Sequence, residues 1–170
     1  MSTKLTVQLI AQILQRGLTL TDDQIWIYNQ RREIPPTPGL FVIVELNGVM
    51  PYGSQNKFNP ATDTETLSQT LQEMITIHAF SRDTTAVERM AEIFGVLNST
   101  YSQQVQELEG FKIGVVPTTV NDVSSLEGAA LLYRIDITLR VLRGYSITRA
   151  VDVYDTFSHE LLTEKGVIEC

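Results

Sequence analysis

The sequence predicts an α+β fold, in which a mainly antiparallel sheet of long strands is flanked by an N-terminal helix and a central helix. Apolar and polar residues alternate over residues 131–142, which is the period of a half-buried strand. At about 3.3 Å per residue this strand is roughly 40 Å long, well beyond the usual five or six residues. Residues 67–79 alternate in the same way, and apolar residues recur at helical spacing between 86 and 101.

The N-terminal part of the chain predicts one helix and two strands. Apolar residues recur at helical spacing over residues 3–16, and Gly17 stands where such a helix would end. The run Ile25 to Tyr28 is β-branched and aromatic, which favours a short strand. Residues 40–46 predict an apolar strand, closed by a hairpin turn at Asn47-Gly48.

Residues 50–66 are polar and punctuated by Gly and Pro, so we expect an extended loop or arm there, either unpaired or loosely paired. Loops of this length usually have a function or are disordered. We expect a C-terminal tail at residues 155–170. The length of 170 residues fits a single domain over residues 1–170.

The central helix is expected at about 84–101, with Asp83 as its cap. Ser102 could cap a brief continuation that stops at Gly110. Residues 111–116 then predict a strand and residues 120–128 a loop. After the long strand, Gly144 could bend the chain before a further extended segment at 147–154.

Composition narrows the class of protein. Apolar residues make up 43% and charged residues 19%, which favours a folded, soluble chain. No apolar run reaches the roughly 18 residues that span a bilayer, and we expect neither membrane insertion nor secretion. The net charge of −7 opposes a role as a free nucleic-acid binder. The one cysteine, Cys170, excludes an intrachain disulfide, so a reducing compartment is expected.

Residues that carry catalysis or bind cofactors form no recognisable pattern. His78 and His159 lack partners at metal-ligand spacing, and the acidic residues after 152 lack calcium-loop spacing. Neither a nucleophile elbow nor a glycine-rich phosphate loop occurs. We therefore expect no catalytic residue, no metal and no cofactor. A small enzyme or ligand-binding domain with a dispersed site near His78 is the alternative from another class.

Two groups of residues are candidates for contacts with other subunits. Arg134, Asp136 and Arg140 share one face of the long strand, where they make cross-strand ion pairs, face water or meet a neighbouring subunit. The polar arm supplies a second group, which consists of Tyr52, Gln55, Lys57 and Phe58.

The order of motifs resembles that of tail terminator and neck proteins of tailed bacteriophages, especially contractile-tailed ones. The resemblance covers about residues 23–154 and lies in patterns of strand, helix and turn. Its segments are Ile77-His78-Ala79-Phe80-Ser81-Arg82-Asp83, Val105-Gln106-Glu107, Phe111-Lys112-Ile113 and Asn121-Asp122-Val123-Ser124, with the strands at 25–30 and 131–134 and the proline-rich connector at 33–39.

The resemblance implies a twisted sheet flanked by helices and a homohexameric ring at the end of the tail tube. Its partners would be other copies of the chain, the tube protein, the sheath protein, and neck or connector proteins, with DNA passing through the ring without specific binding. The expected location is the virion tail or neck, and the host cytoplasm during assembly. A head completion or stopper protein, or a tail tube protein, is the alternative within the same class.

Overall fold

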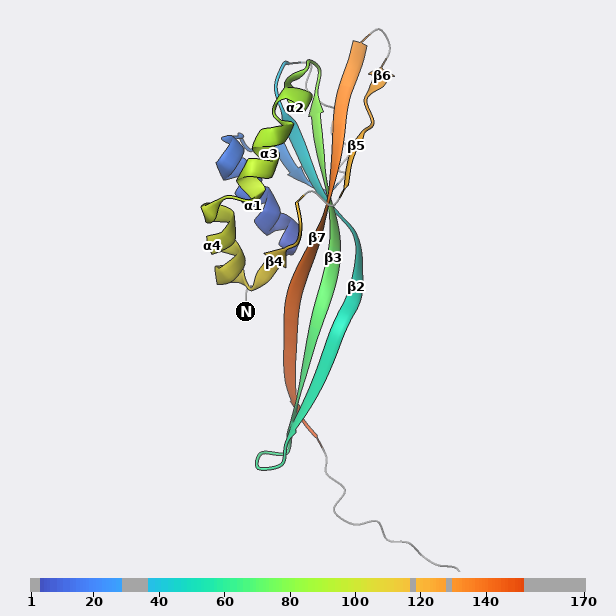
Figure 1. Ribbon diagram of the computed structural model, residues 1–170. Coiled ribbons are helices and arrows are strands. Elements are labelled where there is room, and N and C mark those ends of the chain that lie inside the picture. Colours follow the sequence, from blue (N-terminus) through green and yellow to red (C-terminus); the bar gives the residue numbers. More distant parts are fainter. Residues whose placement is uncertain (1–3, 29–36, 117–118, 128–129, 152–170) are drawn as a thin grey trace, which may run out of the picture.

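A helical layer lies on one face of a long sheet in the computed structural model, which describes residues 4–28, 37–116, 119–127 and 130–151 (Figure 1). The helices are α1 (Thr6–Leu18), α2 (Thr85–Glu88), α3 (Met90–Leu97) and α4 (Thr100–Glu109). The strands are β1 (Ile25–Ile27), β2 (Phe41–Asn59), β3 (Thr64–Ser81), β4 (Phe111–Ile113), β5 (Thr119–Asp122), β6 (Ser125–Glu127) and β7 (Ala130–Ala150).

The sheet has seven strands in the order β1-β2-β3-β7-β4, and β5 and β6 also pair with β7. The α+β class is therefore as predicted. The sheet is mixed and not purely antiparallel, because β1 pairs with β2 in parallel while the other described pairs are antiparallel. β1 has only three residues, and so short a strand gives no sequence pattern that distinguishes parallel from antiparallel pairing.

Three long strands form the middle of the sheet. β3 pairs with β7 without a register shift from Thr64 opposite Ala150 to Ser81 opposite Tyr133. The prediction of over-long strands is confirmed, and β7 continues through Gly144 as one strand of 21 residues. No bend at Gly144 interrupts the pairing, because a glycine in a strand weakens pairing locally without forbidding it.

The predicted hairpin turn at Asn47-Gly48 is wrong. β2 continues through both residues, and its register against β3 shifts between Leu46 and Gly48, so that Asn47 forms a bulge. The Asn47 side chain donates a hydrogen bond to the Thr76 hydroxyl on β3. A bulge accommodates an extra residue within a strand, which is the alternative to a turn for this dipeptide.

Residues 50–66 are paired strand for most of their length, so the unpaired loop is wrong and the paired alternative is confirmed. β2 runs to Asn59 and β3 starts at Thr64, with pairing from one end of this hairpin to the other. The chain reverses at residues 60–63, where the Asn59 side chain accepts a hydrogen bond from the Ala61 amide at 3.1 Å. Backbone pairing with β3 keeps these residues in an extended strand, although their polar side chains show no strand pattern.

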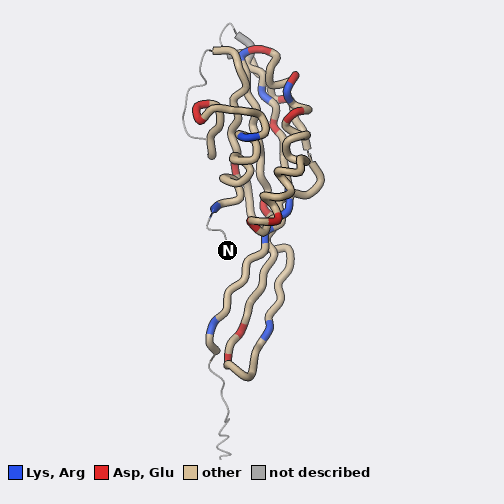
Figure 2. Tube along the Cα trace, turned by 90° about the vertical axis from the view of Figure 1, so that its left-hand side faces the viewer, with Lys and Arg blue, Asp and Glu red and all other residues tan. Residues whose placement is uncertain are grey.

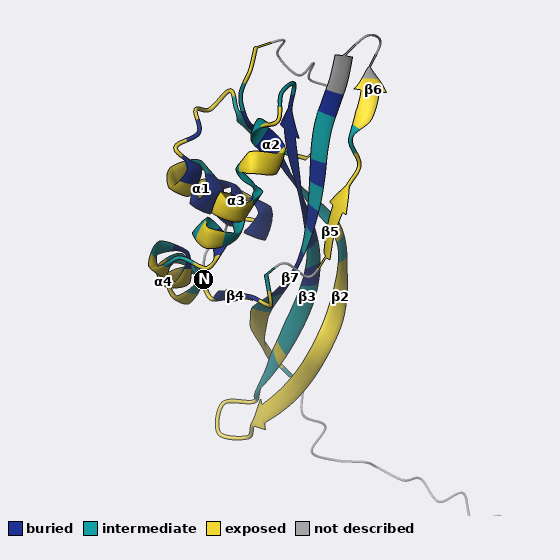
Figure 3. Cartoon of the chain, turned by 45° about the horizontal axis from the view of Figure 1, so that its top comes forward, coloured by how far each residue is buried: buried dark blue, intermediate teal, exposed yellow. Residues whose placement is uncertain are grey.

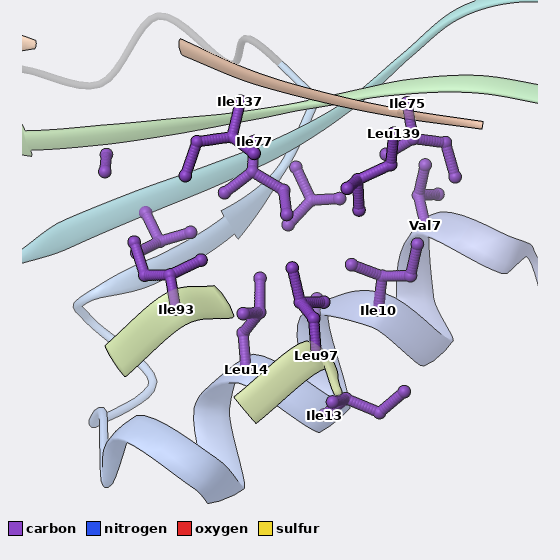
Figure 4. Close-up of a cluster of buried hydrophobic side chains, with 14 of the residues drawn as sticks. Val7, Ile10, Ile13, Leu14, Ile75, Ile77, Ile93, Leu97, Ile137 and Leu139 are labelled. Carbon is purple, nitrogen blue, oxygen red and sulfur yellow. The ribbon is translucent and has the colours of Figure 1, made fainter. Parts of the chain in front are cut away.

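The core lies between the helices and one face of the sheet (Figure 4). Its completely buried side chains include Ile10, Ile13 and Leu14 from α1 and Ile93 and Leu97 from α3. They pack against residues of the central strands, among them Ile75, Ile77, Ile137 and Leu139. The predicted dry face of β3 is confirmed at residues 75, 77 and 79, while Leu67 and Leu71 are half-buried.

The predicted central helix and its predicted continuation form three helices, and between α3 and α4 side chains compete for the backbone groups. The Asn98 amide donates to the Phe94 carbonyl at 3.1 Å, and the Ser99 hydroxyl donates to the Val96 carbonyl at 2.7 Å. Ser99 then caps α4 by accepting a hydrogen bond from the Ser102 amide, so Ser102 is not the cap that we expected. Asp83 accepts a hydrogen bond from the Thr85 amide at the start of α2.

Gly17 lies inside α1 and does not end it. A Cβ atom at this position would approach a Val96 methyl carbon on α3 to 2.3 Å, so glycine permits α1 and α3 to pack closely. The helix ends one residue later, and Thr19 adopts a left-handed conformation with φ 55°. The C-terminal stop of α4 at Gly110 is confirmed, with φ 70°.

The predicted loop at residues 120–128 is wrong, because β5 and β6 pair with β7 there. The described side chains of β5 are all exposed, so their sequence carries no alternation to reveal a strand. The strand predicted at 111–116 is shorter, since β4 ends at Ile113. The proline-rich part of the connector and the predicted tail at 155–170 lie outside the described residues.

Candidate subunit interface

The central strands continue well beyond the helical layer and form a three-stranded extension of the sheet (Figures 1 and 3). We define the extension as residues 46–74, from β2 and β3, together with residues 142–150 of β7. Leu67 on β3 lies at its centre, opposite Asn56 on β2 and Ile147 on β7. Exposure increases along β2 away from the helices, so the extension offers surface to other molecules.

The face of the extension that continues the core face carries partly exposed apolar side chains among charged ones such as Glu65 and Arg149. Side chains alternate along a strand, so Leu67 and Leu71 share the face of the buried Ile75. Phe58, Tyr145 and Ile147 lie opposite or diagonal to Leu67 on this face and are 46%, 48% and 44% exposed. We call it the helix-side face.

The opposite face of the extension is a ladder of hydroxyl groups. The Thr66 and Thr148 hydroxyl oxygens lie 3.1 Å apart, and those of Ser68 and Ser146 lie 3.4 Å apart. Lys57 pairs with Thr66 in the register of β2 and β3, so its side chain is on this face. We call it the hydroxyl face. Its polarity explains why the sequence of this region suggested a loop.

Charges in the extension balance, unlike those of the chain as a whole (Figure 2). The basic residues Lys57, Arg143 and Arg149 equal in number the acidic residues Asp63, Glu65 and Glu73, whereas the whole chain carries −7. Arg149 pairs with Glu65 at 2.8 Å. The hydrogen bond from Asn56 and then the contact with Arg149 lower the pKa of the Glu65 carboxyl. Two extensions can therefore approach without net repulsion.

The part of the sheet that carries the helices on one face has a charged network on its other face. The imidazole of His78 lies between two carboxylates, with Nδ1 2.7 Å from Asp136 and Nε2 3.1 Å from Glu45. Arg134 contacts both carboxylate oxygens of Asp136, at 2.8 and 3.0 Å. A second apolar cluster lies on the same face and consists of Trp26, Phe41, Ile43, Phe80 and Leu132.

Asp136 is held as an anion by this network. Burial alone would raise the pKa of its carboxyl, but hydrogen bonds from Arg134 and His78 and their positive charge outweigh burial and lower that pKa. A side chain with 17% exposure that remains charged requires such partners. The network stabilises the sheet, and its imidazole has both ring nitrogens engaged.

The seven candidate interface residues lie in separate places. Arg134 and Asp136 pair with each other within β7, and the cross-strand contact of Asp136 is with His78. The exposed Arg140 lies opposite Met74. The four residues of the arm are all on the exposed part of β2. Tyr52 is 68% exposed at a register shift, and Gln55 and Lys57 are on the hydroxyl face.

Sequence reasoning missed His78 and Glu45 as members of the network. The pairing of Ile77 with Ile137 would have revealed His78 opposite Asp136, because neighbouring residues in paired strands stay in step. Among the described residues, no three His, Cys, Asp or Glu side chains are grouped so as to hold a metal ion. No helix within the described ranges is long and apolar enough to span a membrane.

Several solved structures are similar to this chain. The chain is similar to a solved sheath/tube terminator, from the PVC extracellular contractile injection system in its extended state. The TM-score is 0.44 and the sequence identity 13%, over 94% of this chain. The chain spans 65% of that protein's length. No family model matches the sequence, and no curated protein matches it.

Proposed function

We propose that the chain is a structural subunit that terminates the tube of a contractile tail and works through its interfaces, without chemistry of its own. The observation that carries this proposal is the uncovered extension. A three-stranded sheet with partly exposed apolar side chains on one face gains stability when another surface covers them. Its side chains Phe58, Tyr145 and Ile147 expose close to half of their surface.

The arrangement favours assembly over catalysis. His78, the residue on which a dispersed active site would depend, contacts two carboxylates, with an arginine beside one of them. These contacts satisfy the imidazole within the sheet. The paired strands of the extension offer an ordered surface, which suits a part that joins others by shape and area.

The finer proposal is a homohexameric ring at the head-proximal end of the tail tube, in the virion neck. It would contact the tube protein, the sheath protein and a connector protein. The motif order described above suggests this position. The overall negative charge would let DNA pass through the ring without being held.

The test is to purify the chain alone and with preassembled tail tubes, and to determine its mass and its place on the tubes. We expect rings at one end of each tube, visible by negative-stain electron microscopy with a tag-directed label. Labels along the whole tube would indicate a tube protein, and labels on the portal side of the neck a stopper. A chain that stays monomeric and never binds tubes would contradict the proposal.

A further inference from the structure

The extension has a free strand edge on each side. Among the described residues, the outer edge of β2 has no partner strand after Glu45. The outer edge of β7 has none after Arg143. Exposed edges present unpaired backbone N–H and C=O groups, which bind another strand readily. Proteins usually protect such edges, so the pattern of protection along each edge is informative.

Proline and register shifts occur only in the first part of the β2 edge, at residues 46–53. There Pro51 lacks a backbone donor, and register shifts occur between Leu46 and Gly48 and between Pro51 and Gly53. From Gly53 to Asn59 the register is unbroken. The β7 edge from Gly144 to Ala150 has neither proline nor register shift. Two regular runs without proline or a register shift therefore remain, one on each side of β3, and each carries one cation, Lys57 or Arg149.

These two runs are similar in length, with six and seven residues, and lie beside the same stretch of β3. Residues 54–59 of β2 and residues 144–150 of β7 pair with the same stretch of β3, which places them side by side across the extension. Both are antiparallel to β3, so they run in the same direction. If copies are arranged around an axis along the strands, the β7 run of one copy can pair in parallel with the β2 run of the next.

We propose that residues 144–150 of one copy pair with residues 54–59 of a second copy and join the extensions into one continuous sheet. This inference rests on the self-association proposed above, and it names the two strand edges that would form the contact. We call this contact between residues 144–150 and 54–59 the joint. A second copy fits better than a foreign strand, because copies satisfy both edges at once. A foreign strand on one edge would leave the other edge unpaired.

Side chains at the joint are compatible with this pairing. The helix-side face would continue across it, bringing Phe58 of one copy beside Tyr145 and Ile147 of the next and covering their exposed surface. The two cations near the joint do not oppose each other. Lys57 is on the hydroxyl face, whereas Arg149 is on the helix-side face and paired with Glu65.

Cysteine pairs test the joint in a full-length Cys170→Ser background, which removes the native thiol. A chain with Ile147→Cys and Phe58→Cys, or Ile147→Cys and Asn56→Cys, has both thiols on the helix-side face. Under mild oxidation we expect covalent multimers on a non-reducing gel. The matched control combines Ile147→Cys with Lys57→Cys, whose thiols are on opposite faces, and we expect at least tenfold less cross-linked product.

A charge substitution gives an independent measurement. Ile147→Lys should weaken self-association at least tenfold by analytical ultracentrifugation, because it places a charge at the joint. Val49→Lys is the control, because Val49 is 50% exposed but lies between the two register shifts of β2, and its association should stay within twofold. Circular dichroism checks that both variants fold.

Each outcome bears on a definite proposal. Multimers from same-face pairs, together with weaker association of Ile147→Lys, support the joint. Rings that form equally well with Ile147→Lys, without same-face cross-links, overturn the edge pairing and leave the proposed ring intact. A chain that does not self-associate at any concentration, with or without tail tubes, overturns both.

Discussion

The Nδ1 atom of His78 on β3 lies 2.7 Å from a carboxylate oxygen of Asp136, its direct partner on β7. The contact crosses the central strand pair on the face that the helices do not cover. Because Arg134 holds the same carboxylate in a two-pronged contact, the charge of Asp136 has partners on its own strand and on the neighbouring strand.

Replacing Asp136 should lower stability most at neutral pH. The folded state lowers the pKa of this carboxyl, so its contribution is present above the unfolded pKa of about 3.9 and is lost as pH falls through the folded value. Asp136→Asn should cost about 1–3 kcal/mol at pH 6. Urea unfolding should show that the difference in free energy of unfolding between Asp136→Asn and the parent chain becomes smaller from pH 6 to pH 3.

The control for this pH series is Glu107→Gln, at an exposed site on α4. Its free energy of unfolding should stay within about 0.5 kcal/mol of the parent. A gap for Asp136→Asn that widens toward pH 3 would contradict the role given to the carboxylate.

Gly17→Ala should destabilise the protein although alanine is the better helix former. The added methyl group would meet Val96 at 2.3 Å and force α1 and α3 apart. Gly95→Ala is the matched control on α3, with nothing within 4 Å of the new Cβ, and should raise stability by up to about 1 kcal/mol. Thermal unfolding measures both. The double variant Gly17→Ala/Val96→Ala should recover part of the loss, and a stabilising Gly17→Ala would contradict the packing.

Ile137→Ala should cost about 2–5 kcal/mol in the free energy of unfolding, because it leaves a cavity under the helices. Ile137 is completely buried among core residues. Ile147→Ala, ten residues further along β7, removes the same atoms from a half-exposed site and should cost less than about 1 kcal/mol in dilute monomer. Denaturant titration compares them. Equal losses would mean that the extension is packed as well as the body.

Hydrogen exchange should differ along β3 in the monomeric chain. Amides at residues 75–81 lie in the covered sheet and should exchange roughly tenfold or more slowly than those at 64–71, which are partly exposed. On assembly, residues 144–150 should gain protection. Mass spectrometry of peptides from monomer and assembled samples measures both effects, and uniform protection along β3 would refute the contrast.

Local sequence patterns predicted the helices and strands that have one face buried against another layer. The stripe of α1 and the alternation at Ile75, Ile77 and Ala79 arise because one face must be dry, and both are found in the structure. The exposed strands, β5 and the part of β2 in the extension, were not predicted as regular strands. Hydrogen bonding to a neighbour keeps β5 and the lower part of β2 extended, and that neighbour is distant in the sequence.

The sequence alone determined the α+β class, the over-long central strands and the apolar helix stripes, because burial imposes a period on the residues that meet the core. Tertiary structure alone decided that residues 50–66 are paired strand, that Gly17 is a contact point between α1 and α3, and that His78 joins Asp136 and Glu45. Strand register and helix approach depend on pairs of residues far apart in the chain, and no local period records which residues those are.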